Sequence, residues 1–179
     1  MINDPVIILV DENDAIIGAK KRSLVSMAIG DIYRITALWV TNSEGAILLA
    51  QRSFSKRNHP GRWAPPVSGT VEEGESYDEN IIKEAQEEIG LSDIPFAKLQ
   101  KLRRSIDQDF FVQWYWVVID RPAEEFAVQK DEIEDIRWFT KEALLDAIKN
   151  EPSKFVPNLV GYIELFTEKS EVRQFDWIR

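Results

Sequence analysis

The sequence predicts an α/β (α+β) domain in which a mixed β-sheet lies between helices. Strand-like segments precede one strongly marked helix, further strands follow it, and helices close the chain, an order that favours such a layered sandwich. The chain has 179 residues, of which 44% are hydrophobic, enough for one domain with a substantial core. Because no repeat, low-complexity segment or linker interrupts it, we expect residues 1–179 to form a single domain.

The predicted strands are short apolar runs separated by turn residues. The run FFVQWYWVVI is so apolar that we expect it to be a central strand covered on both faces, with its aromatic rings used for packing. A hairpin within residues 1–31 should form an N-terminal extension. The expected strands are Val6–Val10 with Ala15–Lys20 as its partner, Ile32–Val40 and Ala46–Gln51 around the turn Thr41–Gly45, Phe96–Arg104 paired with Phe110–Ile119, and Ile136–Phe139.

The helix that begins after Ser76 carries clear end signals. Ser76 and Glu79 have the spacing of a capping box, and Gly90 suits a C-terminal cap. Its packing face should hold the apolar side chains of Ile82, Ala85 and Ile89.

The C-terminal part, residues 141–179, is expected to be mainly helical. Thr140 is a suitable N-cap for a helix over Lys141–Asn150, and Pro152 and Pro157 separate it from a last helix, about Asn158–Lys169. The tail that begins at Ser170 has no clear pattern. The remaining segments are expected to be loops: Arg22–Gly30, with a helical turn, Arg52–Pro66 and Arg121–Lys130.

Charge and composition exclude several classes of function. The 22 basic and 31 acidic residues give a net charge of −9, which argues against non-specific nucleic-acid binding. The chain has no cysteine, which excludes a disulfide scaffold, a cysteine nucleophile and a cysteine-ligated zinc site. No basic, apolar leader and no run of about 20 apolar residues is present, so we expect a cytoplasmic protein that does not span a membrane. The sequence leaves monomer and homodimer open.

Three carboxylates share one face of the capped helix. Glu84, Glu87 and Glu88 stand at i, i+3 and i+4, so they repel one another unless a cation lies among them. Oxygen ligands of this kind suit Mg²⁺, which proteins hold with one or two carboxylates plus substrate phosphates. A solvated acidic face has the same pattern, and spacing alone does not separate the two interpretations.

This region resembles the Nudix box, Gly-x5-Glu-x7-Arg-Glu-U-x-Glu-Glu-x-Gly-U, where U is a bulky apolar residue. Ala85 is small for the first U, and Lys83 replaces the arginine, keeping its charge but not the planar two-pronged donor that would orient a neighbouring glutamate. The positions that match are Gly69, Glu75, Glu84, Glu87, Glu88, Gly90 and Leu91.

The resemblance implies a Nudix-type α/β/α sandwich over roughly Ile32–Asn150 and hydrolysis of a diphosphate with Mg²⁺ or Mn²⁺. In this reading the metal is held by the Gly69 carbonyl and by Glu84, Glu87 and Glu88, with Glu84 also a candidate to orient the attacking water. Lys83 completes the catalytic set, and Glu75 stabilises the loop. Glu132 or Glu134 could add a carboxylate, although a solvated loop explains either residue equally well.

A basic segment lies just upstream of the acidic helix. Arg52, Lys56 and Arg57 are candidates to bind an anionic substrate, although each alone is also typical of a solvated loop. Trp63 could stack on a base or fill the core.

The N-terminal half further resembles the isopentenyl diphosphate isomerase branch of this superfamily. The similar stretches are VDENDAIIGAKKRS, LLAQRS and W-x-PPVSG. Alignment places Ser68 where those isomerases have a catalytic cysteine and Thr70 where they have a metal-binding histidine. Serine is a far weaker acid than cysteine, and threonine is a poor replacement for a histidine ligand.

We therefore expect a metal-dependent hydrolase that cleaves a diphosphate linkage in a nucleoside di- or triphosphate or a related nucleotide derivative. An isopentenyl diphosphate isomerase-like enzyme and a non-catalytic nucleotide-sensing module are the two alternatives. Ser68 and Thr70 oppose the first, and the complete set of glutamates opposes the second.

Overall fold

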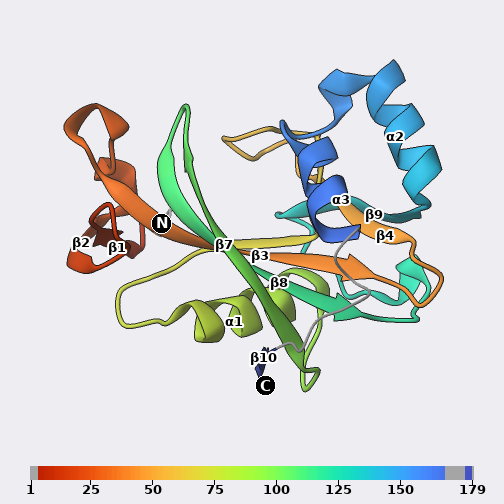
Figure 1. Cartoon of the computed structure of the whole chain (residues 1–179), viewed down its shortest axis with the longest axis horizontal. Helices are drawn as coiled ribbons and strands as arrows, with labels where there is room; N and C mark the ends of the chain where they lie inside the picture. Colours follow the sequence, from red (N-terminus) through yellow and green to blue (C-terminus); the bar gives the residue numbers. More distant parts are fainter. Residues whose placement is uncertain (1–3, 168–175, 179) are drawn as a thin grey trace.

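The computed structural model describes residues 4–167 and 176–178 and shows a mixed β-sheet with helices on both sides, as predicted (Figure 1). The helices in these residues are α1 (Tyr77–Ile89), α2 (Lys141–Asn150) and α3 (Leu159–Thr167). The strands are β1 (Val6–Val10), β2 (Ile16–Lys21), β3 (Ile32–Thr41), β4 (Ile47–Arg52), β5 (Trp63–Ala64), β6 (Val67–Thr70), β7 (Phe96–Ser105), β8 (Asp109–Val118), β9 (Ile133–Phe139) and β10 (Asp176–Ile178).

The parallel pairing of β3 with β8 forms the centre of the sheet. Their register runs from Tyr33 opposite Phe110 to Thr41 opposite Val118. The other pairings are antiparallel: β7 with β8 and β10, β3 with β1, β4 and β6, β1 with β2, and β4 with β5 and β9. The expected central strand is therefore confirmed, since β8 lies between β3 and β7.

Alternate side chains of the two central strands enter two different hydrophobic cores. Leu38 and Tyr115 are buried in the core that α1 covers with Ile81, Ala85 and Ile89. Trp39 and Trp114 point to the opposite face, where α2 and α3 contribute Leu144, Leu159 and Ile163. This alternation places α1 on one face of the sheet and α2 and α3 on the other (Figure 1).

The expected turn between β3 and β4 forms, but the strands separate at once. Thr41 and Ile47 are the one residue pair between them. Beyond this pair, β3 is hydrogen-bonded to β8 and β6, whereas β4 is hydrogen-bonded to β9 and β5. Because their edges are taken by these other strands, β3 and β4 do not continue as a hairpin.

The N-terminal hairpin forms as expected and joins the sheet through β1 and β3. At its turn, Asp14 is buried and accepts hydrogen bonds from Arg34 Nε at 2.7 Å and from the Tyr77 hydroxyl at 3.0 Å. Lys101 also pairs with this carboxylate. The extension is therefore attached to the first residue of α1.

Several boundaries differ from expectation because tertiary pairing extends or creates strands. The loop expected over Arg52–Pro66 contains β5, which pairs with β4, and β6 follows it against β3. Strand β9 begins three residues before the expected Ile136, because Ile133 pairs with Arg52. In the unassigned tail, β10 pairs with β7.

The last helix also starts later than expected. Asn158 has a φ of 64°, in the left-handed region, so α3 begins only at Leu159. Residues 168 and 169 of the predicted helix lie outside the described part of the chain. No helix within that part is long and apolar enough to cross a membrane.

The end signals of α1 are confirmed. The Ser76 hydroxyl accepts from the Glu79 amide at 3.2 Å, the Ser76 amide donates to Glu79 Oε2 at 2.8 Å, and Gly90 has a φ of 68°. The expected packing face is confirmed and includes one more residue: Ile81 is fully buried, and the half-buried Ile82 packs against the same core as Ala85 and Ile89. Ile81, Ala85 and Ile89 stand four residues apart, so they form the row that faces the sheet.

We predict that Ser76→Ala lowers the free energy of unfolding by about 1 kcal/mol, because it leaves an N-terminal amide of α1 without its cap. Urea unfolding monitored by circular dichroism measures the change. Ser92→Ala is the matched control, since Ser92 is exposed and outside any helix, and it should shift stability by less than about 0.5 kcal/mol. Equal stability of the two variants would contradict the prediction.

Candidate active site

Strand β6 passes so close to α1 that residue 69 has no room for a side chain. A Cβ at Gly69 would lie 2.3 Å from Glu84 Cγ. The backbone conformation is not the reason for glycine here, since Gly69 is absent from the positive-φ glycines. The close approach itself requires it, and it places the acidic face of the helix against the backbone of the strand.

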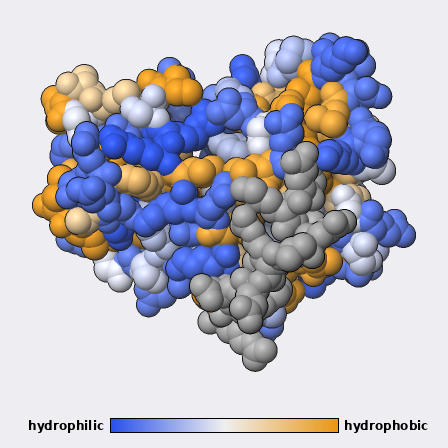
Figure 2. Space-filling view, in the orientation of Figure 1, coloured by the Kyte–Doolittle hydropathy of each residue, from blue (hydrophilic) through white to orange (hydrophobic). Residues whose placement is uncertain are grey.

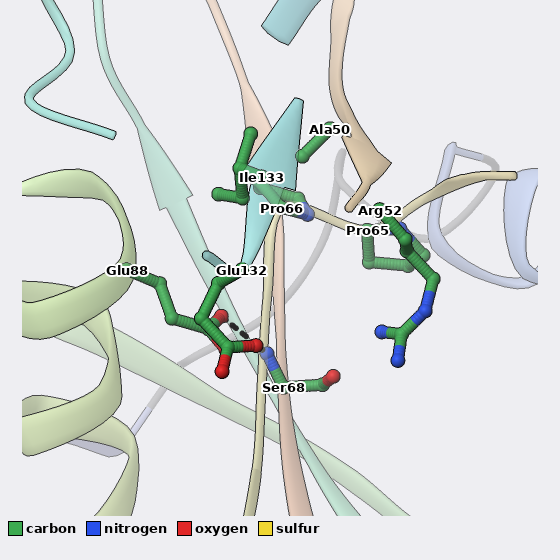
Figure 3. A pocket seen from close by; sticks show the side chains of 8 residues that line it. All are labelled: Ala50, Arg52, Pro65, Pro66, Ser68, Glu88, Glu132 and Ile133. Atoms are coloured by element: carbon green, nitrogen blue, oxygen red, sulfur yellow. Dashed lines mark hydrogen bonds between the residues drawn. The ribbon is translucent and has the colours of Figure 1, made fainter. Parts of the chain in front are cut away.

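Glu88 is the most deeply buried of the three helix glutamates. Its side chain reaches over β6, where Oε2 accepts a hydrogen bond from the Ser68 amide at 3.1 Å (Figure 3). Burial, followed by the charge of Glu84, raises the pKa of this carboxyl from 4.5 to about 8. The surroundings of Glu88 therefore destabilise the charged form of its carboxyl group.

Glu84 and Glu87 differ from Glu88 in exposure. Glu84 is half-buried, and burial, followed by the charge of Glu87 against the opposing effect of Lys83, raises its pKa. Its Oε1 atom lies 3.7 Å from Lys83 Nζ. Glu87 is exposed at the rim. The expected triad thus spans the full range from core to solvent.

The donor set suits a hard divalent ion. It consists of oxygen atoms from Glu84, Glu87 and Glu88 with the strand backbone at Gly69 directly beneath Glu84. As arranged, however, no three acidic or histidine side chains among the described residues converge closely enough to hold a metal. Since these like charges repel, a cation among them would be needed to draw the carboxylates together.

Lys83 is held by the carboxylates around it. Its Nζ lies 2.6 Å from Glu75 Oε1 and 3.5 Å from Glu72 Oε1. Burial alone would lower the pKa of Lys83, but the hydrogen bond with Glu75 and the charges of Glu84 and Glu75 raise it. Glu75 also accepts from the Glu72 amide at 3.1 Å, so it contacts both the loop backbone and Lys83, as the sequence suggested.

Glu88 also lines a small pocket, where the Glu132 carboxyl group lies beside it and Arg52 lies on the opposite side (Figure 3). Glu132 pairs with Lys56, whereas Glu134 is exposed, so the structure distinguishes the two acids that the sequence left open. The pocket is lined by Ala50, Arg52, Pro65, Pro66, Ser68, Glu88, Glu132 and Ile133.

The four expected substrate-binding residues do not come together. Arg52 lines the pocket and donates from Nε to the Asn58 carbonyl at 3.0 Å, and Lys56 reaches the pocket through Glu132. Arg57 is exposed and forms no ion pair with a residue the structure describes. Trp63 is 8% exposed and packs edge-on against Phe139 in the core, so its ring does not face the pocket.

The two isomerase positions have different surroundings. Ser68 lines the pocket, with its amide held by Glu88. Thr70 is half-buried at the end of β6, and its carbonyl accepts a hydrogen bond from Asn80 Nδ2 at 3.2 Å.

Asn80 is a site residue that the sequence analysis missed. It is fully buried on α1 and hydrogen-bonds Thr36, Glu75 and Glu84. A polar residue next to the apolar Ile81 was the available signal, but the sequence alone does not show which strand it faces.

The pattern of the NUDIX domain matches residues 32–159, and the chain belongs to this family. It is therefore a hydrolase that acts on phosphorus-containing anhydrides, a class that generally uses divalent metal ions.

The chain is similar to several individual proteins of known name or structure. A prenyl-diphosphate phosphatase of Methanosarcina mazei is 34% identical, and the match covers 90% of this chain and 95% of that protein. An isopentenyl-diphosphate Delta-isomerase of Salmonella arizonae is 27% identical, over 86% of this chain and 87% of that one. Among solved structures, a Deinococcus radiodurans protein superposes with a TM-score of 0.76 at 23% identity, covering 89% and 98% of the two chains, and supports the fold.

We predict that Glu88 makes the metal-free protein less stable as the pH rises. Its folded-state pKa of about 8 exceeds its ordinary value of 4.5, so the folded protein binds this proton more tightly than the unfolded chain does. The stability that comes from the bound proton is complete below pH 4.5 and is lost as the pH rises to about 8. With chelator at pH 9, Glu88→Gln should therefore unfold with a free energy higher by on the order of a few kcal/mol than the wild type, and the difference should shrink towards pH 5.

Urea unfolding at several pH values tests this prediction. Glu87→Gln is the control, because the exposed Glu87 side chain should change stability by less than about 0.5 kcal/mol. A pH-independent difference between Glu88→Gln and the wild type would show that the Glu88 carboxyl does not titrate as described.

We also predict that Lys83→Met lowers kcat severalfold and leaves KM nearly unchanged. The variant loses the cation that holds Glu75 and borders Glu84, while the pocket around Arg52 stays intact. Lys83→Arg should keep or raise kcat, because arginine supplies two parallel donors. Steady-state kinetics with the best substrate measures both variants, and equal rates in all three proteins would reduce Lys83 to a surface charge.

Proposed function

We propose that this protein is a metal-dependent pyrophosphohydrolase that cleaves the diphosphate linkage of a small organic diphosphate. The observation that supports this most directly is the position of Glu88: it lies at the contact between α1 and β6 and lines the same pocket as Arg52 and Glu132. Carboxylates for a metal and a cation for phosphate are thus side by side.

The residues take distinct roles in this proposal. Glu84, Glu87 and Glu88, with the Gly69 carbonyl, would hold Mg²⁺ or Mn²⁺, which would neutralise charge on the phosphoryl group and activate a water molecule for attack. Glu84, half-buried beside Glu88, orients the attacking water. Arg52 and Lys56 bind phosphate oxygens, and Lys56 exchanges part of its pairing with Glu132 for the substrate.

A nucleoside di- or triphosphate, or a related nucleotide derivative, is the first candidate substrate. It carries the diphosphate group for which the glutamates, Arg52 and Lys56 are suited. Trp63, however, is buried in the core and offers no ring to a base.

A prenyl diphosphate is the second candidate, and two observations favour it. Apolar side chains, Ala50, Pro66 and Ile133, form one wall of the pocket beside the charged groups. The Methanosarcina mazei relative named prenyl-diphosphate phosphatase also matches almost along its full length. An alkyl chain needs an apolar wall rather than a stacking platform.

A substrate panel tests the proposal. We expect phosphate or pyrophosphate release from at least one compound among ADP, ATP, a nucleotide sugar and isopentenyl, dimethylallyl and geranyl diphosphate, with Mg²⁺ or Mn²⁺ required and chelator abolishing it. Glu87→Gln and Glu88→Gln should each reduce turnover by at least about 100-fold, because each removes a charged oxygen that holds the ion.

Glu44→Gln is the control, since Glu44 is exposed in the turn between β3 and β4, and it should retain full activity. Full turnover in Glu88→Gln would remove the metal-site assignment. Exchange of solvent protons into isopentenyl diphosphate at an enzymatic rate would instead indicate the isomerase, and tight nucleotide binding without turnover would indicate a sensing module.

A further inference from the structure

The buried amide of Asn80 has its donors and acceptors fixed by its neighbours. Asn80 and Thr36 are both 0% exposed, and the Thr36 hydroxyl donates to Asn80 Oδ1 at 2.6 Å. On the other side, Asn80 Nδ2 faces only acceptors: the Thr70 carbonyl at 3.2 Å, Glu75 Oε2 at 2.9 Å and Glu84 Oε1 at 3.4 Å. A carbonyl and two carboxylates need a donor, so the amide nitrogen must point towards them.

This arrangement connects the centre of the sheet to the acidic face of the helix. Thr36 belongs to β3, the strand that pairs with both β6 and β8, and Thr70 ends the strand that carries Gly69. Because the hydroxyl holds one end of the amide, its other end has little freedom to follow a moving carboxylate. The sheet therefore determines where two glutamates of the box can sit.

Packing alone does not require a polar side chain at this position. The neighbouring Ile81 and the next turn's Ala85 fill the core with apolar groups, and a buried amide is costly unless its hydrogen bonds are made. Asn80 makes them with the Thr36 hydroxyl, the Thr70 carbonyl and the two carboxylates of the site.

We propose that Asn80, held by Thr36, is a positioning residue that sets the Glu84 carboxylate and the Glu75–Lys83 pair for binding the divalent ion. The inference rests on the proposed metal-dependent function. Asn80 does not touch the ion or the substrate. It acts through Glu84, over Gly69, and through Glu75, which in turn holds Lys83 at 2.6 Å.

The experiment measures Mn²⁺ binding directly as well as turnover. Using the full chain, stripped of metal, Mn²⁺ is titrated and the free ion is followed by electron paramagnetic resonance. We expect Asn80→Ala to weaken Mn²⁺ binding by about 10-fold or more, as removal of an orienting partner commonly does. With the best substrate, kcat should fall by a similar factor, while KM at saturating Mn²⁺ stays within about twofold because Arg52 is untouched.

Two further comparisons separate positioning from mere stability. Ile81→Val trims a buried side chain on the same turn without touching the network, so it should lower the melting temperature and leave Mn²⁺ affinity unchanged. Thr36→Val keeps the shape but removes the hydroxyl, and it should weaken Mn²⁺ binding severalfold, whereas Thr36→Ser should restore it. If Asn80→Ala does not fold, the comparison of Thr36→Val with Thr36→Ser tests the proposal by itself.

The outcomes are distinguishable. If the wild type binds Mn²⁺ and Asn80→Ala and Thr36→Val bind it equally tightly, the positioning role is wrong and the proposed function stands. If the wild type binds no Mn²⁺, the proposed function is wrong and the positioning role falls with it. Loss of affinity in Ile81→Val as large as in Asn80→Ala would also overturn the positioning role.

Discussion

The close contact between β6 and α1 at Gly69 is the constraint on which the site depends. One side of β6 is paired with β3, so the strand cannot retreat, and the absence of a side chain at Gly69 lets the helix approach until Glu84 lies over the backbone. The same approach brings the Ser68 amide within 3.1 Å of Glu88. Backbone groups of the strand and carboxylates of the helix therefore form one unit, and a larger residue at position 69 would separate them.

The local distribution of charged side chains explains how an acidic protein can accommodate an anionic substrate. The net charge is −9, and hydrophilic residues cover much of the face of the molecule that Figure 2 shows. Near the site, however, the positive and negative side chains lie in separate places. Lys83 lies at one side of the glutamates and is occupied by Glu75, whereas Arg52 and Lys56 lie at the pocket on the other side. Interactions between charges fall off over a Debye length of about 8 Å, so this local arrangement matters more to a small diphosphate than the distant surface does.

The sequence predicts the central elements of this fold because their signals are local. The capping box of α1, the apolar run of β8 and the Thr140 cap of α2 each depend on neighbours along the chain, and each appears as expected. Strands β5, β6 and β10 are short segments whose pairing partners are distant in sequence. Such strands exist because of tertiary hydrogen bonds, which no local pattern reveals.

The candidate site also combines features that the local sequence predicts with features that depend on distant contacts. The spacing of Glu84, Glu87 and Glu88 along one helix is a local property, and the structure does place them along one side of α1. Their exposure was not predictable, because it depends on how closely β6 approaches. Asn80, Glu132 and the burial of Trp63 likewise depend on contacts between elements far apart in the chain, namely α1 with β3, the loop before β9 with Lys56, and β5 with β9.

The kinship with both a diphosphate phosphatase and an isomerase raises the question of which chemistry this pocket supports. Protonation of an unactivated alkene requires a strong acid in surroundings that exclude water and do not trap the cation that forms. In the alignment by sequence, Ser68 stands at the position of that acid, and it lines a pocket with Arg52, Glu88 and Glu132. A hydroxyl donates its proton far less readily than a thiol. Phosphoryl transfer places the opposite demands on a site, because it needs oxygen ligands for a metal and cations for phosphate, and those are the groups that α1 and the Arg52–Lys56 segment supply.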